Sequence, residues 1–208
     1  VLFRSFVDDG SSDRTSDMLF AWAYVDKRVK VIELSRNFGH EAAVLAGLDH
    51  ALGNAVVTLD ADLQDPPELI LEMLERYREG YDVVYGKRDK RLGEGLVKRA
   101  TASAFYSLMR NYLHRDLPEN VGNFRLMSRE VVSAVCQLRE GQRFFRGMVA
   151  WLGFKQVAVV FNRPARAAGE TKYSMRKMML FALDSILSFS SAPLRIATYM
   201  GGMVVLLG

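Results

Sequence analysis

The sequence predicts an α/β fold in which a mostly parallel sheet is flanked by helices. Three observations support this prediction. Short apolar runs alternate with helical segments through the first ninety residues, which is the rhythm of repeated strand–helix–strand units. The run over residues 55–59 is almost wholly apolar, as is typical of a parallel strand buried on both faces. Carboxylates follow two of the runs, at Asp8–Asp9 and at Asp60–Asp62, and open parallel sheets bind ligands at the carboxyl ends of their strands.

Turn and capping residues delimit the first elements. Phe6–Val7 ends a strand, and the Asp-, Gly- and Ser-rich run after it begins a helix over residues 14–25. Residues 29–34 form the second strand. Small residues over 39–52 then form a helix that ends at Gly53.

The third strand, residues 55–59, leads into a more strongly patterned helix. Asp65 would cap this helix, a proline pair suits its first turn, and Glu68 lies three residues after the cap. One face is apolar at helical spacing and consists of Leu69, Ile70, Met73, Leu74 and Tyr77. Gly80 ends the helix, and residues 81–85 form the fourth strand.

The second half is less regular. It contains an extended segment over 121–127 and a strand over 155–161. Helices are predicted over residues 92–113, 129–138, 141–152 and 175–189, with a basic, glycine-containing loop over 163–173.

Composition and charge restrict the class of protein. Half of the 208 residues are hydrophobic and 25% are charged, which excludes a disordered chain, and the single cysteine, Cys136, excludes a disulfide framework. The net charge of +4 hides an asymmetry, because residues 1–90 carry −6 and residues 91–208 carry +10. The acidic first half does not suit a nucleic-acid binder.

The last residues predict a membrane-proximal segment. Thirteen uncharged residues follow Arg195, fewer than the roughly 20 that a bilayer span needs. We interpret residues 193–208 as a truncated transmembrane segment and 174–192 as an amphipathic helix in the membrane interface, which leaves residues 1–173 as one catalytic-type domain. The alternative for both segments is an ordinary buried helix.

The carboxylates at the strand ends predict a cation site. Acidic groups at one sheet edge repel each other unless a cation lies between them, and magnesium is bound by one or two carboxylates together with substrate phosphates. Capping or turn formation is the simpler interpretation of Asp13 and Asp65, but it does not explain Asp60 and Asp62 after a buried strand.

Six sequence blocks are distributed along the chain. They are FVDDGSSDRT (6–15), SRNFG (35–39), LDADLQDPPE (59–68), GNFRLMSR (122–129), RFFRGMVAWLG (143–153) and GETKYS (169–174). Together these blocks resemble glycosyltransferase family 2, and within it the polyprenyl-phosphate glycosyltransferases of the dolichyl-phosphate mannose synthase and bactoprenol glucosyltransferase types. The resemblance covers nearly the whole chain.

The resemblance implies a Rossmann-like GT-A fold and inverting transfer of a sugar from a nucleotide-diphosphate sugar, UDP-glucose or similar, to polyprenyl (undecaprenyl) phosphate. It implies Mg²⁺ or Mn²⁺ as cofactor, and the nucleotide sugar, the lipid phosphate and the bilayer as partners, with no nucleic acid and with homo-oligomerisation left open. The enzyme is expected on the cytoplasmic face of the membrane, anchored by C-terminal transmembrane helices that are mostly missing from this sequence.

The resemblance also implies roles for individual residues. In the donor site it places Asp8, Asp9, Arg36, Asn37, Gly39, Asp60 and Lys172, with His40 lining it. Asp62 and Gln64 would hold the metal, and the catalytic group would comprise Asp62, Asn123, Arg125, Arg143 and Arg146, whose arginines face phosphates. Asn123 stands where many relatives have Asp. A solvated helix face is the alternative for Arg143 and Arg146, which lie three residues apart.

Two other functions remain open from the sequence. One is a family 2 transferase with a saccharide hydroxyl acceptor, which would need a carboxylate base near Asn123. The other is a non-catalytic doubly wound binding module. The family's first strand is expected before residue 1, and Arg4 and Ser5 interrupt an otherwise apolar strand, so residues 1–5 could be foreign. We therefore expect the 208-residue chain to be inactive alone.

Overall fold

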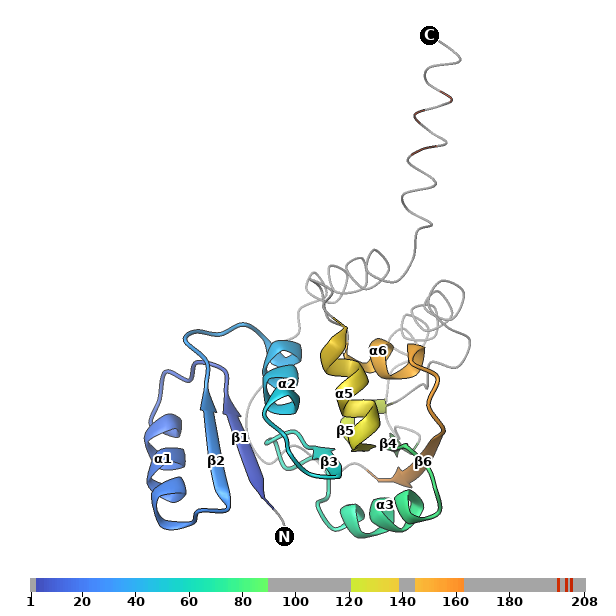
Figure 1. The fold of residues 1–208 in the computed structure, drawn as a ribbon. Helices are drawn as coiled ribbons and strands as arrows, with labels where there is room; N and C mark the ends of the chain where they lie inside the picture. Colours follow the sequence, from blue (N-terminus) through green and yellow to red (C-terminus); the bar gives the residue numbers. More distant parts are fainter. Residues whose placement is uncertain are drawn as a thin grey trace.

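The computed structural model describes residues 3–89, 121–138 and 145–162, together with the isolated helical positions 198, 201 and 203 (Figure 1). These residues form an α/β fold in which helices lie against strands throughout. The predicted helices over 92–113 and 175–189, the loop over 163–173 and most of the last segment lie outside the described residues. Within the described part, no helix combines the length and apolarity that a membrane crossing requires.

The first unit is a parallel strand pair with one helix. Strand β1 (Arg4–Asp8) pairs in parallel with β2 (Val29–Glu33), and α1 (Thr15–Val25) connects them. The Asp13 carboxylate accepts a hydrogen bond from the Thr15 backbone N–H at 3.0 Å. This bond and one from the Thr15 side chain lower the pKa of Asp13, so its interpretation as a residue of the helix start is confirmed.

The larger sheet has the strand order β3-β5-β4-β6. Its strands are β3 (Ala55–Thr58), β4 (Val83–Arg88), β5 (Val121–Ser128) and β6 (Gln156–Phe161). Strand β5 runs antiparallel to both β3 and β4, whereas β4 and β6 are parallel. The prediction of one mostly parallel sheet is therefore wrong for the described strands, which form two sheets with as many antiparallel pairings as parallel ones.

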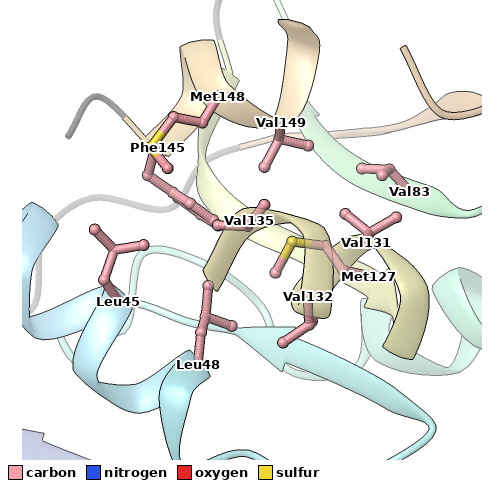
Figure 2. Close-up of a cluster of buried hydrophobic side chains, with 10 residues drawn as sticks. All are labelled: Leu45, Leu48, Val83, Met127, Val131, Val132, Val135, Phe145, Met148 and Val149. Carbon is pink, nitrogen blue, oxygen red and sulfur yellow. The ribbon is translucent and has the colours of Figure 1, made fainter. Parts of the chain in front are cut away.

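Helices cover both faces of the larger sheet (Figure 1). One face packs against α3 (Leu69–Arg78), and the other packs against α2 (His40–Asp49), α5 (Arg129–Gln137) and α6 (Phe145–Trp151). Neighbouring residues of one strand therefore enter different cores. Figure 2 shows Val83 and Met127 in the core beneath α5. Their neighbours Val84 and Leu126 belong to the other core, with Met73 of α3. Burial on both faces explains the continuous apolar runs, because strands exposed on one face alternate instead.

The order and type of the described elements agree with the sequence prediction, but several boundaries differ. Strand β4 runs over Val83–Arg88 rather than 81–85, and α2 ends at Asp49 rather than at residue 52. Helix α3 begins at Leu69, and its N-cap residue, Glu68, makes no side-chain capping bond. Asp65 is only 2% exposed, and its carboxylate lies 3.8 Å from the Arg88 guanidinium. The interpretation of Asp65 as a helix cap is therefore wrong, because α3 begins four residues later and the Asp65 carboxylate lies beside Arg88 of β4.

Candidate active site

The loop after β1 contacts the loop after β2. The Asp9 carboxylate accepts the backbone N–H groups of Phe38, at 2.7 Å, and Gly39, at 2.9 Å. Gly10 has φ of +71°, and a Cβ there would lie 2.7 Å from the backbone of Arg36. A side chain at residue 10 is thus excluded by conformation and by space. The predicted donor-site blocks are held together by this packing.

Asp8, at the end of β1, is the buried member of the acidic pair. It is 4% exposed, and its Oδ1 accepts the Ser11 backbone N–H at 3.0 Å and the Ser11 hydroxyl at 2.5 Å. Its Oδ2 is buried without a hydrogen-bond partner in the described part of the chain. Arg36 and Asn37 lie exposed on the adjoining loop, where the Arg36 guanidinium stacks 4.1 Å above the Phe38 ring.

The turn after β3 contains the predicted metal residues. The Gln64 backbone N–H donates to the Asp62 carboxylate at 3.1 Å, and Leu63 between them has φ of +58°. A left-handed, 71% exposed leucine is strained backbone, which persists where the surrounding structure requires it. The described residues contain no group of three His, Cys, Asp or Glu side chains able to hold a metal ion. A carboxylate and an amide oxygen nevertheless fit magnesium, whose remaining ligands come from water and substrate phosphates.

The first residue of α2, His40, joins the end of β3 to β5. Its Nε2 lies 3.5 Å from the Asp60 carboxylate and 2.5 Å from the Asn123 side-chain nitrogen. Asn123 is 5% exposed, and its backbone carbonyl accepts the Thr58 hydroxyl. Because β5 is antiparallel to β3, its beginning lies at the carboxyl end of β3. Two predicted site residues 63 positions apart are thereby brought to one histidine.

Arg125 lies within the sheet as a buried cation. It pairs in register with Thr58 of β3 and Tyr85 of β4 and is 3% exposed. Burial, followed by repulsion from Arg146, lowers the pKa of Arg125 to about 9. Its Nη2 donates to the Gly122 carbonyl at 3.0 Å, whereas its Nε is buried without a hydrogen-bond partner among the described residues. No carboxylate of the described residues forms a salt bridge with it.

Residues of α2 and α6 complete the surroundings of Arg125. The Phe145 ring stacks 4.8 Å from its guanidinium carbon, and the Glu41 carboxylate accepts the Phe145 backbone N–H at 2.9 Å. Glu41 also favours the charged form of Arg125 electrostatically. Arg146 is half-buried and donates to the Val121 carbonyl at 3.0 Å, so a simple solvated helix face does not describe it.

The N-terminal end of α2 therefore organises the predicted site. Three consecutive residues reach three different groups: Gly39 reaches Asp9, His40 reaches Asp60 and Asn123, and Glu41 reaches α6 beneath Arg125.

Sequence reasoning missed Glu41, Thr58 and Phe145. Glu41 directly follows the donor block and Phe145 lies between two arginines, which were the available signals. Arg143 and Lys172 lie outside the described residues, so their predicted roles stay predictions.

Comparison with known proteins identifies the family. The model of "Glycosyl transferase family 2" matches residues 5–136. The chain belongs to glycosyl transferase family 2. It is similar to an uncharacterized glycosyltransferase of Bacillus subtilis, with 52% identity over 94% of the chain and 61% of the relative. It is also similar to a prophage bactoprenol glucosyl transferase homolog of Escherichia coli, with 44% identity over 96% of the chain and 65% of the relative.

This family 2 transferase spans less than two thirds of those relatives. Among solved structures, glucosyl-3-phosphoglycerate synthase from Mycobacterium tuberculosis with phosphoglyceric acid matches 89% of the chain and 68% of its own, with TM-score 0.56 and 19% identity. The same enzyme with Mn²⁺, UDP-glucose and glycerol 3-phosphate matches 88% of this chain and 66% of its own, with TM-score 0.51 and 18% identity. At these identities the likeness shows the fold alone, and it confirms a glycosyltransferase fold of the GT-A type.

Proposed function

We propose that this family 2 enzyme transfers a glucosyl or similar group from a UDP-sugar to polyprenyl phosphate, with inversion at the anomeric carbon, at the cytoplasmic face of the membrane. The buried Arg125 beside Arg146 is the observation that carries the proposal. Two neighbouring guanidinium groups repel each other, and burial removes the water that would screen them. An anion bound beside them would relieve this cost, and both substrates carry phosphate.

The reaction needs positioning more than acid–base catalysis. A phosphate oxygen of the lipid attacks the anomeric carbon, and the bond from that carbon to the β-phosphate oxygen breaks. UDP leaves with the bonding electron pair. The attacking oxygen is already anionic at neutral pH, so no strong general base is required. Arginine suits two-point contact with phosphate, and the half-buried Arg146 would make it while Arg125 adds positive potential from within the sheet.

The acidic half would bind the donor. Asp62 and Gln64 would hold Mg²⁺ or Mn²⁺, which when bound neutralises the diphosphate and stabilises it as a leaving group. The solved relative with Mn²⁺ and UDP-glucose supports a divalent ion of this kind. Asp8, Asp9 and Asp60 would lie along the nucleotide. The loop of Arg36–Gly39 is fixed against Asp9 by two hydrogen bonds, which supports a preformed donor site.

The homologues' names support the lipid acceptor. Relatives named bactoprenol glucosyl transferase, including one from Shigella phage SfV, are 44% identical over 94% of the chain. A saccharide hydroxyl acceptor is the second candidate, because His40 beside Asp60 could serve as the base that a hydroxyl needs.

The test is a chimera in which the chain replaces the matching region of the Shigella phage SfV enzyme, since the chain spans 64% of that relative. Membranes containing the chimera are incubated with radiolabelled UDP-glucose, Mn²⁺ and undecaprenyl phosphate, with the unaltered phage enzyme as the positive control. We expect label in the lipid phase as an acid-labile sugar phosphate. Label only in a water-soluble saccharide, or none while the phage enzyme is active, would refute the proposal.

Binding to the 208-residue chain gives an independent measurement. Calorimetric titration with UDP-glucose should show binding with Mn²⁺ and none with excess EDTA. Equal binding in both conditions would contradict the metal's role in donor binding.

A further inference from the structure

The side chain of His40 lies between Asp60 and Asn123, two predicted site residues that no other side chain of the described structure connects. The His40 side chain is 48% exposed, and its Nε2 lies close to Asn123 of β5 and to Asp60 in the turn after β3. Helix α2 thus presents an imidazole both to the turn after β3 and to β5.

Asn123 depends on this histidine for its orientation. Within the described structure, the contact with His40 is the only hydrogen bond made by the Asn123 side chain, and its Oδ1 is buried without a partner. The Thr58 hydroxyl fixes the backbone at this residue but not the amide. An amide that loses its one partner is free to rotate, or it stays unpaired at a cost of about 1–3 kcal/mol.

The chemistry of the ring nitrogen couples Asn123 to Asp60. A neutral imidazole nitrogen either carries a proton and donates, or carries a lone pair and accepts, but not both. With a lone pair, Nε2 accepts from the Asn123 amide but faces the Asp60 carboxylate unfavourably. With a proton, Nε2 suits Asp60, and the Asn123 amide must turn its oxygen towards the ring. The state of His40 therefore determines which end of the amide points away from it.

We propose that His40 is a positioning residue for sugar transfer. Its Nε2 orients the side-chain amide of Asn123 relative to the Asp60 carboxylate. The inference rests on the proposed function insofar as Asp60 and Asn123 belong to the transfer site. His40 acts through Asn123 and needs no contact with the reacting atoms, so a side chain that replaces its Nε2 contact should replace its function.

The kinetic test compares three variants in the phage-enzyme chimera. His40→Phe keeps a ring but removes both nitrogens, His40→Gln returns a polar group near the Nε2 position, and His50→Gln is the matched control at the exposed C-terminal end of α2. We expect His40→Phe to lower kcat by about 10- to 100-fold with little change in KM for UDP-glucose. His40→Gln should recover most of kcat, and His50→Gln should match the parent.

A double-mutant cycle separates positioning from simple packing. Asn123→Ala alone should lower kcat, and adding His40→Phe to it should cause little further loss, since the ring then has no amide to hold. Losses that multiply, an unchanged kcat in His40→Phe, or a failure of His40→Gln to recover activity would overturn the inference. The last result would indicate base catalysis, because glutamine cannot take up the proton.

A spectroscopic measurement keeps the inference separate from the proposed function. In the 15N-labelled chain, Asn123→Ala should move the His40 Nε2 resonance and leave that of His50 in place. If the chimera transfers no sugar but this resonance moves, the proposed function fails and the His40–Asn123 link stands. If the resonance does not move, the inference is wrong whatever the chimera does.

Discussion

Replacing Arg125 by methionine should stabilise the ligand-free chain, and in the phage-enzyme chimera it should abolish sugar transfer. The fall in the pKa of Arg125 from its ordinary value above 12 to about 9 corresponds to a cost of roughly 5 kcal/mol for keeping the buried group charged. Stacking on Phe145 returns about 2 kcal/mol, and the charged hydrogen bond to the Gly122 carbonyl returns about 1.5–3 kcal/mol.

The remainder is an uncompensated cost of up to about 1.5 kcal/mol, which Arg125→Met removes while filling a similar volume. Urea unfolding at neutral pH should therefore show a free energy of unfolding higher by about 1 kcal/mol. The matched control is Arg129→Met. Arg129 is not enclosed in the sheet and makes two hydrogen bonds to the Gly53 carbonyl, so its replacement should destabilise by about 1 kcal/mol.

The pH dependence of the unfolding free energy tests independently whether the buried charge of Arg125 is destabilising. Between about pH 9 and the ordinary guanidinium pKa, the unfolded chain binds more protons at Arg125 than the folded chain does. Stability contributed by this residue must therefore rise as pH increases through about 9, and the advantage of Arg125→Met over the parent must shrink there. The predicted cost of burial is refuted if Arg125→Met is less stable than the parent by about 2 kcal/mol or more and the difference in unfolding free energy does not change near pH 9. The contacts of the guanidinium would then compensate fully for its burial.

Three further outcomes are expected. Gly10→Ala should lower the melting temperature more than Gly80→Ala, because both positions have positive φ but only the Gly10 Cβ would meet backbone, at 2.7 Å; equal losses would contradict the close approach. Asp9→Ala should cost about 2 kcal/mol of unfolding free energy and weaken UDP-glucose binding measured by calorimetry, because two backbone N–H groups lose their acceptor; unchanged affinity would separate the loop from the donor site. Asp62→Asn should weaken Mn²⁺-dependent UDP-glucose binding by at least about tenfold while the melting temperature of the metal-free chain stays the same; a lowered melting temperature would indicate a folding defect instead.

Local pattern was sufficient for most elements of the fold. The helical spacing from Leu69 to Tyr77 and the apolar run at 55–58 each report which sides of one segment are buried, and both elements are present. The local pattern gave a wrong prediction at Asp65. A capping role was plausible from the neighbouring residues, but the Asp65 carboxylate lies beside the guanidinium of Arg88, on β4. The prediction of a mostly parallel sheet failed for the same reason. An apolar run that is buried on both faces does not indicate which strand lies beside it or whether that strand is parallel or antiparallel.

The sequence by itself determined the order of elements, the carboxylates at the ends of two strands and membership of glycosyl transferase family 2, because these depend on residues close together in the chain. Only the tertiary structure decided that β5 lies antiparallel between β3 and β4. That placement brings Asn123 to His40 and Asp60 and encloses Arg125 in the sheet. The physical reason is that strand pairing and burial are set by contacts between distant segments, and the charge of a guanidinium becomes costly only once those contacts have removed its water.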